Sequence, residues 1–204
     1  MANYKLYGRT NSGSWAVQVA LEEIGLPYES FWVGREPADI EQLQKINPTG
    51  KVPALVLPDG TMMFESAAML IHLAQVCPQA GLAPAVPGQA VFLQWMVFLS
   101  ANVYEAALRM YYPERYSAGG VSVDAIKLKA KLDFVAHLEV ISSSLAPYVL
   151  GDRYSIADAY LYMLASWWPD DKLQFSARLP KIAAHTQVIA ARPAVKKIEA
   201  LHAV

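Results

Sequence analysis

Residues 47–66 read NPTGKVPALVLPDGTMMFES, and this stretch decides the fold. Residues 54–57 form a short apolar run of the kind found in strands, and residues 61–64 form a second one. Pro58-Asp59-Gly60 between them is a hairpin turn, because proline presets φ while Asp and Gly tolerate the reversal. Residues 65–66 then open an apolar helix that ends near Cys77. The stretch therefore predicts a β-hairpin followed at once by a helix.

Pro53 stands at the entry of the first strand, where the missing N–H group of proline removes no ladder bond. A cis Val52–Pro53 bond, which is accessible at X-Pro, would bend the chain and turn the N–H and C=O groups of Val52 outward. These two groups can pair with an extended peptide as if it were one more strand. Ser66 and the first amides of its helix offer an anion site, and Glu65 adds a negative charge. The combination predicts a site for a small peptide with an amino-acid head group.

This order of elements resembles the glutathione-binding half of the glutathione S-transferase family, in which N-P-x-G-K-V-P-A-L, a hairpin and E-S follow one another. The resemblance implies that glutathione is the co-substrate and that Val52 binds its cysteinyl backbone. It also implies that Pro53 is a cis-proline and that Glu65 and Ser66 hold the γ-glutamyl end.

The glycine carboxylate of glutathione requires a cation. Lys51 matches a contact made in theta-like members of the family, and Arg35 follows the second predicted strand. A solvated surface position is the alternative explanation for either residue.

Composition excludes several other classes of protein. The chain has 204 residues, of which 54% are hydrophobic and 17% charged, so it is globular and large enough for one large or two small domains. Its net charge of −1, without a block of like charges, argues against a nucleic-acid partner and against a polybasic membrane anchor. No run reaches the ~18 apolar residues of a membrane span.

Cysteine and histidine usage points to a reducing compartment and to no metal. Cys77 is the one cysteine, so no disulfide framework can form within the chain, and we expect a cytoplasmic protein. The four histidines are scattered without ligand spacing, which predicts no metal site: His72, His137, His185 and His202.

The pattern along the chain predicts two domains. Residues 3–7 and 28–33 are typical of strands, residues 15–24 of a helix between them, and residues 34–46 of a weaker helix or loop. With the hairpin and the next helix, this predicts a thioredoxin-like βαβαββα domain over residues 1–77, with parallel pairing in its first βαβ unit. Residues 78–88, rich in proline and glycine, are expected to be a linker.

Residues 89–204 show only helical patterns, which predicts an all-helical second domain. Long helices are expected over residues 89–112 and 122–145, and further helices over residues 179–190 and 193–201. Ser155 and Asp158 have the spacing of a capping box before an apolar helix. A G-x-x-x-S-x-A-D cap at this place is a second motif of the same family, so the resemblance covers the whole chain.

A transferase of this kind must stabilise the glutathione thiolate, because a free thiol with a pKa near ~8.5 is mostly protonated at neutral pH. In the family the hydrogen-bond donor follows the first strand. The chain most resembles bacterial theta-, beta- and nu-like members. The resemblance places Asn11 at the position of the catalytic serine of theta-like and zeta-like members, while Gly13 replaces the cysteine of beta-like members. Ser12, Ser14 and Tyr7 are the further candidates; ordinary helix capping is the alternative for the serines, and a strand aromatic for Tyr7.

The electrophile is expected to bind the helical domain. Tyr104, Leu108 and either Tyr111 or Tyr112 share one face of the first long helix. With Arg109 they would form an aromatic, partly cationic wall that suits a planar apolar electrophile. Helix packing and a dimer contact are the alternative explanation for this face.

The resemblance implies a cytoplasmic, homodimeric transferase of detoxification that conjugates glutathione to an apolar electrophile. A glutathione-dependent disulfide reductase or peroxidase is the first alternative. A dithiol mechanism is excluded for it, because the chain has no C-x-x-C pair. A non-catalytic binding protein with the same fold is the second alternative.

Overall fold

A computed structural model describes residues 3–202. The chain divides into two compact units. The first contains the described residues up to Ala83 together with those from Ala191 onward, and the second spans Pro84–Ala190. The sequence pattern had assigned all of residues 89–204 to the helical domain, whereas the last helix is grouped here with the first unit.

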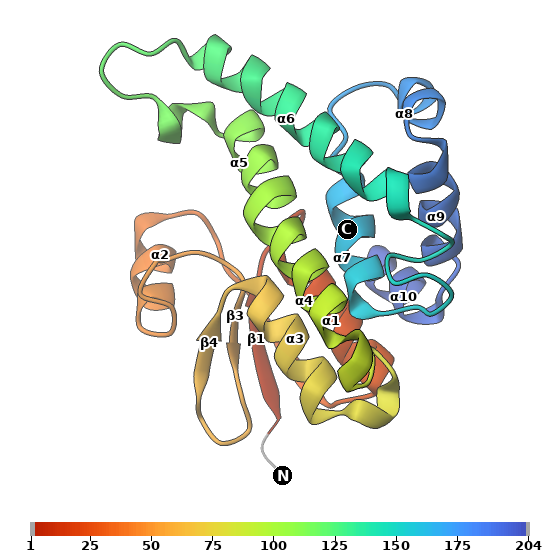
Figure 1. The fold of residues 1–204 in the computed structure, drawn as a ribbon. Coiled ribbons are helices and arrows are strands. Elements are labelled where there is room, and N and C mark those ends of the chain that lie inside the picture. Colours follow the sequence, from red (N-terminus) through yellow and green to blue (C-terminus); the bar gives the residue numbers. More distant parts are fainter. Residues whose placement is uncertain (1–2, 203–204) are drawn as a thin grey trace. The chain divides into compact units, whose positions relative to one another are not determined.

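The first unit begins with the predicted βαβαββα order. Its elements are β1 (Tyr4–Gly8), α1 (Ser14–Ile24), β2 (Tyr28–Trp32), α2 (Pro37–Gln44), β3 (Ala54–Val56), β4 (Met62–Phe64), α3 (Ser66–Val76) and α10 (Pro193–His202). Within the described residues the strands form a four-stranded sheet of order β2-β1-β3-β4. Strands β1 and β2 run parallel, as predicted, and the other pairs are antiparallel. Helices α1 and α3 pack together on one side of the sheet, and α2 lies on the other (Figure 1).

Helix α10 is fastened to α1 by side chains that are far apart in sequence. The Arg192 guanidinium donates from Nε and Nη2 to the two carboxylate oxygens of Glu23, at 2.6 and 2.8 Å. Lys197 donates to Glu22 at 2.7 Å. A forked pair of this kind is more strongly oriented than a single ion pair. These contacts explain why the end of the chain belongs to the first unit. No local sequence pattern predicts them.

The second unit is entirely helical, as predicted. Its α-helices are α4 (Gln89–Phe98), α5 (Glu105–Tyr111), α6 (Val123–Ser144), α7 (Ile156–Ala165), α8 (Lys172–Arg178) and α9 (Pro180–Ala190). A π-helical segment, Leu99–Tyr104, joins α4 to α5 and interrupts what the sequence predicts as one regular helix. Together with α5 it packs against α6, while α7 packs against α9. Helix α8 was not predicted, because its residues are mostly exposed and carry little apolar periodicity.

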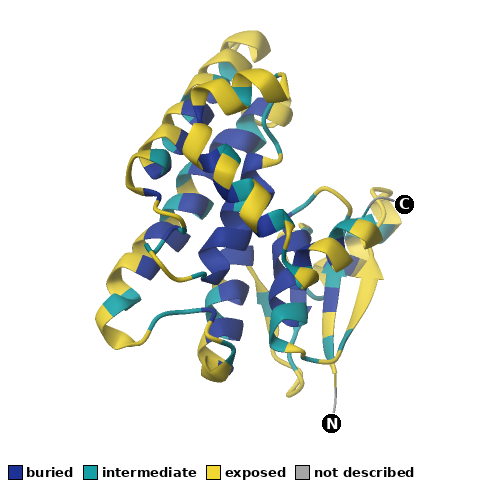
Figure 2. Ribbon diagram, turned by 90° about the vertical axis from the view of Figure 1, so that its right-hand side faces the viewer, coloured by how far each residue is buried: buried dark blue, intermediate teal, exposed yellow. Residues whose placement is uncertain are grey.

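A helix between Val86 and Tyr111 meets the length and composition criteria for a membrane span, the one stretch of residues 3–202 that does so. The core helix of a soluble protein can meet the same criteria. Polar residues such as Gln89 and Gln94 divide this segment, which is why it contains no uninterrupted apolar run. Phe92, Trp95 and Met96 are buried in the helical unit. In both units the buried residues gather on the inner faces of the helices (Figure 2).

The Ser155–Asp158 capping box forms as predicted at the start of α7. The carboxylate of Asp158 is completely buried and accepts from the backbone N–H and the hydroxyl of Ser155, at 2.8 and 3.1 Å. It also accepts from the N–H of Val149 at 2.7 Å and contacts Nε2 of His185 at 2.9 Å. A single carboxylate thus joins the preceding loop, the start of α7 and helix α9.

Candidate active site

The sheet register brings the predicted glutathione-binding segments to one edge. Tyr7 pairs with Ala54 and Ala54 pairs with Phe64, so the end of β1, the start of β3 and the end of β4 lie next to one another. Gly8 pairs with Trp32, which places the end of β2 at the same edge. Apart from Tyr7, which lies on β1 itself, the chain segments that follow or precede these ends carry every site residue predicted in the first unit. The segments are 9–14, 33–35, 51–53 and 65–66.

The loop before β3 is built around Asn47. Asn47 is 2% exposed; its amide nitrogen donates to the C=O group of Lys51 at 2.6 Å, and its oxygen accepts from the N–H and hydroxyl groups of Thr49 at 3.0 and 2.9 Å. The Val52–Pro53 bond that follows is cis, as predicted. Within residues 3–202 no hydrogen bond uses the N–H or C=O group of Val52. Both groups are therefore free to pair with an extended ligand.

The end of β4 turns into α3 through an unusual backbone conformation. Glu65 has φ 72° and ψ 105°, and such a conformation is costly for a residue with a side chain. Ser66, 5% exposed, is the first residue of the eleven-residue helix α3. The first amides of a helix attract anionic groups, and the exposed Glu65 carboxylate can attract a cationic one. The turn thus offers adjacent receptors for the two charges of an amino-acid head group.

The loop between β1 and α1 is braced by its serines. The Ser12 hydroxyl donates to the C=O group of Arg9 at 2.7 Å and lies 2.9 Å from the Ser14 hydroxyl. Ser14 is completely buried, and its hydroxyl accepts from the N–H of Arg9 at 3.2 Å. It also underlies Gly8, where a Cβ atom would lie 2.6 Å from the Ser14 oxygen. Both hydroxyl groups are thus engaged by the loop itself.

Asn11 lies at the exposed tip of the same loop. Its φ of 52° is in the left-handed region, which asparagine tolerates better than most residues. Asn11 and Glu65 are the two non-glycine residues with positive φ in the described part of the chain. No hydrogen bond within residues 3–202 engages the side-chain amide of Asn11. That amide is therefore a donor left available by the fold.

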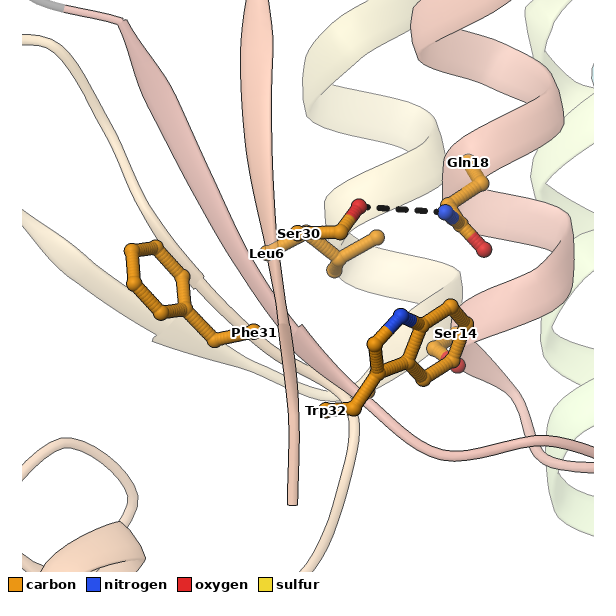
Figure 3. A pocket seen from close by; sticks show the side chains of 7 residues that line it. Leu6, Ser14, Gln18, Ser30, Phe31 and Trp32 are labelled. Carbon is orange, nitrogen blue, oxygen red and sulfur yellow. Dashed lines mark hydrogen bonds between the residues drawn. The ribbon is translucent and has the colours of Figure 1, made fainter. Parts of the chain in front are cut away.

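Tyr7 occupies a strand position beside another aromatic residue. Its ring stacks on Phe31, with the centroids 4.9 Å apart and the planes 16° apart. On the other side of β2, Ser30 and Trp32 line a shallow hollow with residues of α1, and Gln18 donates to Ser30 at 3.1 Å (Figure 3). Phe31 points away from that hollow (Figure 3). Tyr7 thus has the contacts of a strand aromatic.

The two candidate cations for a glycine carboxylate are both exposed. Lys51 precedes Val52 directly, and within residues 3–202 its ammonium group has no ion-pair partner. Arg35 follows Val33 and Gly34, whose C=O groups accept from the Arg9 guanidinium at 3.0 and 2.6 Å. The backbone that carries Arg35 is therefore fixed, while its own guanidinium has no partner among residues 3–202 and is available to a ligand.

The predicted aromatic wall lies on α5 and its neighbours. The Tyr104 ring contacts Trp167, with centroids 5.1 Å apart at an angle of 61°. Tyr111 donates its hydroxyl to the C=O group of Trp167 at 2.6 Å, which commits it to packing. The ring of Tyr112 instead stacks under the guanidinium of Arg115 at 4.0 Å. Helix α5 carries Leu108 four residues after Tyr104, while Tyr112 caps the end of α5 with a non-helical backbone and donates its N–H to the C=O of Leu108 at 2.8 Å.

Sequence reasoning missed the residues that hold the loops. Asn47 stands in the N-P-x-G motif, and its Asx-type bonds are typical of asparagine in turns, so this signal was present. Gly8 and Arg9 gave no comparable signal, because their roles depend on the close approach of Ser14 and of the end of β2. Among the described residues no group of three or more His, Cys, Asp or Glu side chains is arranged to hold a metal ion.

Two family models match the chain. The model of the glutathione S-transferase N-terminal domain matches residues 13–76, and the model of the C-terminal domain of the same family matches residues 104–193. A glutathione S-transferase-like protein of Beauveria bassiana is 30% identical over 212 residues, covering 98% of this chain and 95% of that protein.

Solved structures agree with the family models. A glutathione transferase homologue from Sulfitobacter, with bound glutathione, has a TM-score of 0.90 and 29% identity and covers all of both chains. A sphingomonad glutathione S-transferase complexed with glutathione has a TM-score of 0.82 and 28% identity, covering 98% of this chain and 99% of that one. This chain belongs to the glutathione S-transferase family.

Proposed function

We propose that this protein binds glutathione, stabilises its thiolate and conjugates it to an apolar electrophile. The observation that carries the proposal is the unpaired N–H and C=O of Val52 at the sheet edge where the other predicted contacts gather. Two solved structures of similar fold contain bound glutathione, which supports the choice of ligand. In this proposal Val52 and Pro53 receive the cysteinyl part as an added strand.

The two ends of glutathione would bind on either side of Val52. Glu65 would hold the γ-glutamyl ammonium group, while Ser66 and the first amides of α3 would hold its carboxylate. Lys51 or Arg35 would pair with the glycine carboxylate. This assignment uses each charge of the ligand once and sets it against the opposite charge or dipole.

The side-chain amide of Asn11 would donate to the glutathione sulfur. A hydrogen bond to the charged form of a thiol lowers its pKa, so more of the bound thiol is ionised at neutral pH. Asn11 is preferred to Ser12 and Ser14 because both hydroxyl groups already bond the loop backbone. We propose that the serines position the loop and that Asn11 acts on the sulfur.

Tyr104, Leu108 and Tyr112 would bind the apolar part of the electrophile. The thiolate then forms a C–S bond with the electrophilic carbon, and the leaving group departs with its bonding electron pair. We further propose that the protein acts as a homodimer in the cytoplasm and removes reactive electrophiles. The single cysteine, Cys77, is buried and unpaired in the structure, as suits a reducing compartment.

Asn11→Ala and Ser12→Ala test the donor assignment. Ultraviolet absorbance of the bound thiolate, titrated against pH, gives the thiol pKa in each variant. We expect Asn11→Ala to return that pKa toward the free value of about 8.5. Its kcat with chlorodinitrobenzene should fall roughly ten- to hundredfold. Thiolate formation that survives in Asn11→Ala but is lost in Ser12→Ala would assign the role to Ser12.

Retention on immobilised glutathione tests the cofactor, and two assays separate the activities. Conjugation of chlorodinitrobenzene supports the transferase. Turnover of hydroxyethyl disulfide without conjugation would instead support a disulfide reductase, in which two glutathione molecules supply both sulfur atoms. Failure to bind glutathione at all would leave the non-catalytic alternative.

A further inference from the structure

Two arginines near the proposed electrophile wall of the helical unit have no carboxylate partner among the described residues. Arg109 lies on α5, one residue after Leu108, and Arg115 follows in the short 3-10 helix over residues 113–116. Arg109 is partly buried and donates from Nε to the C=O of Glu105 at 3.4 Å. Within residues 3–202 neither guanidinium forms an ion pair with an aspartate or glutamate.

The acidic residues closest in sequence do not neutralise these arginines. The carboxylate of Glu105 lies near the hydroxyl of Tyr116, and Glu114 is exposed without an ion-pair partner in the described chain. The pKa of Tyr116 is raised, chiefly by burial and then by Glu105. The positive charges of Arg109 and Arg115 oppose this shift. Both guanidiniums therefore act electrostatically on the same hydroxyl group.

Arg115 is also held in a defined position. Its guanidinium carbon lies 4.0 Å from the centre of the Tyr112 ring, and its backbone N–H donates to the C=O of Tyr112 at 3.1 Å. A stacked guanidinium keeps its in-plane N–H groups free to bind an anion. Tyr112 thus carries a planar cation on one of its faces.

We propose that Arg109 and Arg115 select electrophiles in which a planar aromatic body carries a carboxylate. This inference rests on the proposed function, because it assigns the substrate class of the same electrophile wall. The aromatic body would lie against Tyr104, Leu108 and Tyr112, and the carboxylate would accept hydrogen bonds from the terminal N–H groups of the two guanidiniums. A fork of N–H donors matches the two oxygens of a carboxylate, whereas it offers nothing to a neutral ring.

Chlorodinitrobenzene and chlorodinitrobenzoate form a matched pair for the test. In both, the glutathione thiolate forms a C–S bond to the ring carbon, and chloride leaves with the electron pair of the broken C–Cl bond. The ratio of kcat/KM for the benzoate to that for the neutral compound therefore isolates the contribution of the carboxylate. We expect wild-type protein to favour the benzoate, with an advantage that shrinks as ionic strength rises.

Arg109→Gln and Arg115→Gln should each lower that ratio about tenfold. Arg115→Lys keeps the charge but not the fork, so we expect a partial loss. Arg153→Gln is the matched control, because Arg153 is an exposed arginine in the loop before α7. It removes the same charge away from the wall and should leave the ratio at the wild-type value. Thermal unfolding of each variant checks that the helical unit remains folded.

Binding of nitrobenzoate and nitrobenzene, followed by intrinsic fluorescence without glutathione, separates this inference from the proposed function. Tighter binding of nitrobenzoate that weakens in Arg109→Gln and Arg115→Gln supports the inference, even where conjugation of both electrophiles is absent and the transferase assignment falls. Equal binding of the two probes to wild-type protein overturns the inference. A benzoate preference that persists in both glutamine variants overturns it as well.

Discussion

Asn47 in the first unit and Asp158 in the second are both buried, with 2% and 0% exposure, and both bond the backbone of a neighbouring loop. Asn47 donates and accepts, and it fixes a loop whose next residues leave Val52 unpaired. Asp158 only accepts hydrogen bonds, and the N–H groups of Val149 and Ser155 that donate to it are thereby satisfied. A buried polar side chain next to backbone groups without hydrogen-bond partners thus indicates a binding site. One that itself bonds the neighbouring backbone groups indicates a role in stability.

Asp158→Ala should produce the largest loss of stability. It leaves the N–H groups of Ser155 and Val149 and the ring of His185 buried without their acceptor, which costs about 3–5 kcal/mol of unfolding free energy. Denaturant unfolding followed by circular dichroism measures this change. Asp152→Ala is the control, because Asp152 is exposed in the same loop.

The comparison also requires that Asp158→Ala retain normal glutathione affinity under conditions where it is folded. Calorimetric titration with glutathione at low temperature measures that affinity. A weakened affinity in the folded variant would show that the Asp158 network serves binding as well, and the proposed separation of roles would be lost.

Asn47→Ala should lower the unfolding free energy less than Asp158→Ala does, but it should weaken glutathione binding more. Three hydrogen bonds are lost, and the C=O group of Lys51 loses its donor, so we expect a loss of about 2–3 kcal/mol. Because the freed loop carries Val52, the Kd for glutathione should rise roughly tenfold. Asn3→Ala is the control, since Asn3 is exposed and makes one long contact. Unchanged glutathione affinity in Asn47→Ala would contradict the role assigned to this loop.

The sequence was sufficient for the parts of this site that depend on backbone pattern. The hairpin, the helix at Ser66 and the capping box at Asp158 are all local in sequence and were predicted, while the cis bond at Pro53 was implied by the family resemblance. Turn chemistry and helix caps act over a few residues, so a single chain displays them.

Features that depend on distant contacts were not predicted. Arg192 pairs with Glu23 across 169 positions, and nothing near either residue indicates the other. The π-helical segment at Leu99–Tyr104 was also missed, since its sequence fits a regular α-helix. The preference for the Asn11 amide as donor also depends on the structure, because only there do Ser12 and Ser14 bond the backbone of the loop.

Gly8→Ala should have an intermediate effect that extends the comparison to the loop of Asn11. The added Cβ would lie 2.6 Å from the Ser14 oxygen, so α1 or the loop must shift, at a cost of about 1–3 kcal/mol. Since the same loop carries Asn11, the pKa of bound glutathione should rise. Ser14→Gly removes the clash, so adding Gly8→Ala to it should cost less than in wild type. Equal costs in the two backgrounds, measured by unfolding, would mean that the contact with Ser14 is not the cause.

Substitution of His202 should change the unfolding free energy least, because only one of its two ring nitrogens has a hydrogen-bond partner within the described chain. Its Nε2 lies 2.6 Å from the amide oxygen of Gln18, its ring meets Trp32 edge-on, and within the described chain its Nδ1 has no partner. Burial lowers the pKa of this histidine below its usual 6.5. The unfolded chain therefore binds the proton more tightly, so the contribution of His202 is complete above about pH 6.5 and declines as pH falls.

Unfolding measured at about pH 7.5 and about pH 5.5 tests this sign. The loss of stability on acidification should be smaller in His202→Gln than in wild type. Burial also lowers the pKa of His137, so His137→Gln is measured in parallel to separate the two contributions. Because α10 is fastened to α1 by Arg192 and Lys197 as well, acid should weaken this attachment without releasing it. Unlike Asn47 and Asp158, His202 makes a stabilising contribution that depends on pH, because burial lowers the pKa of its imidazole.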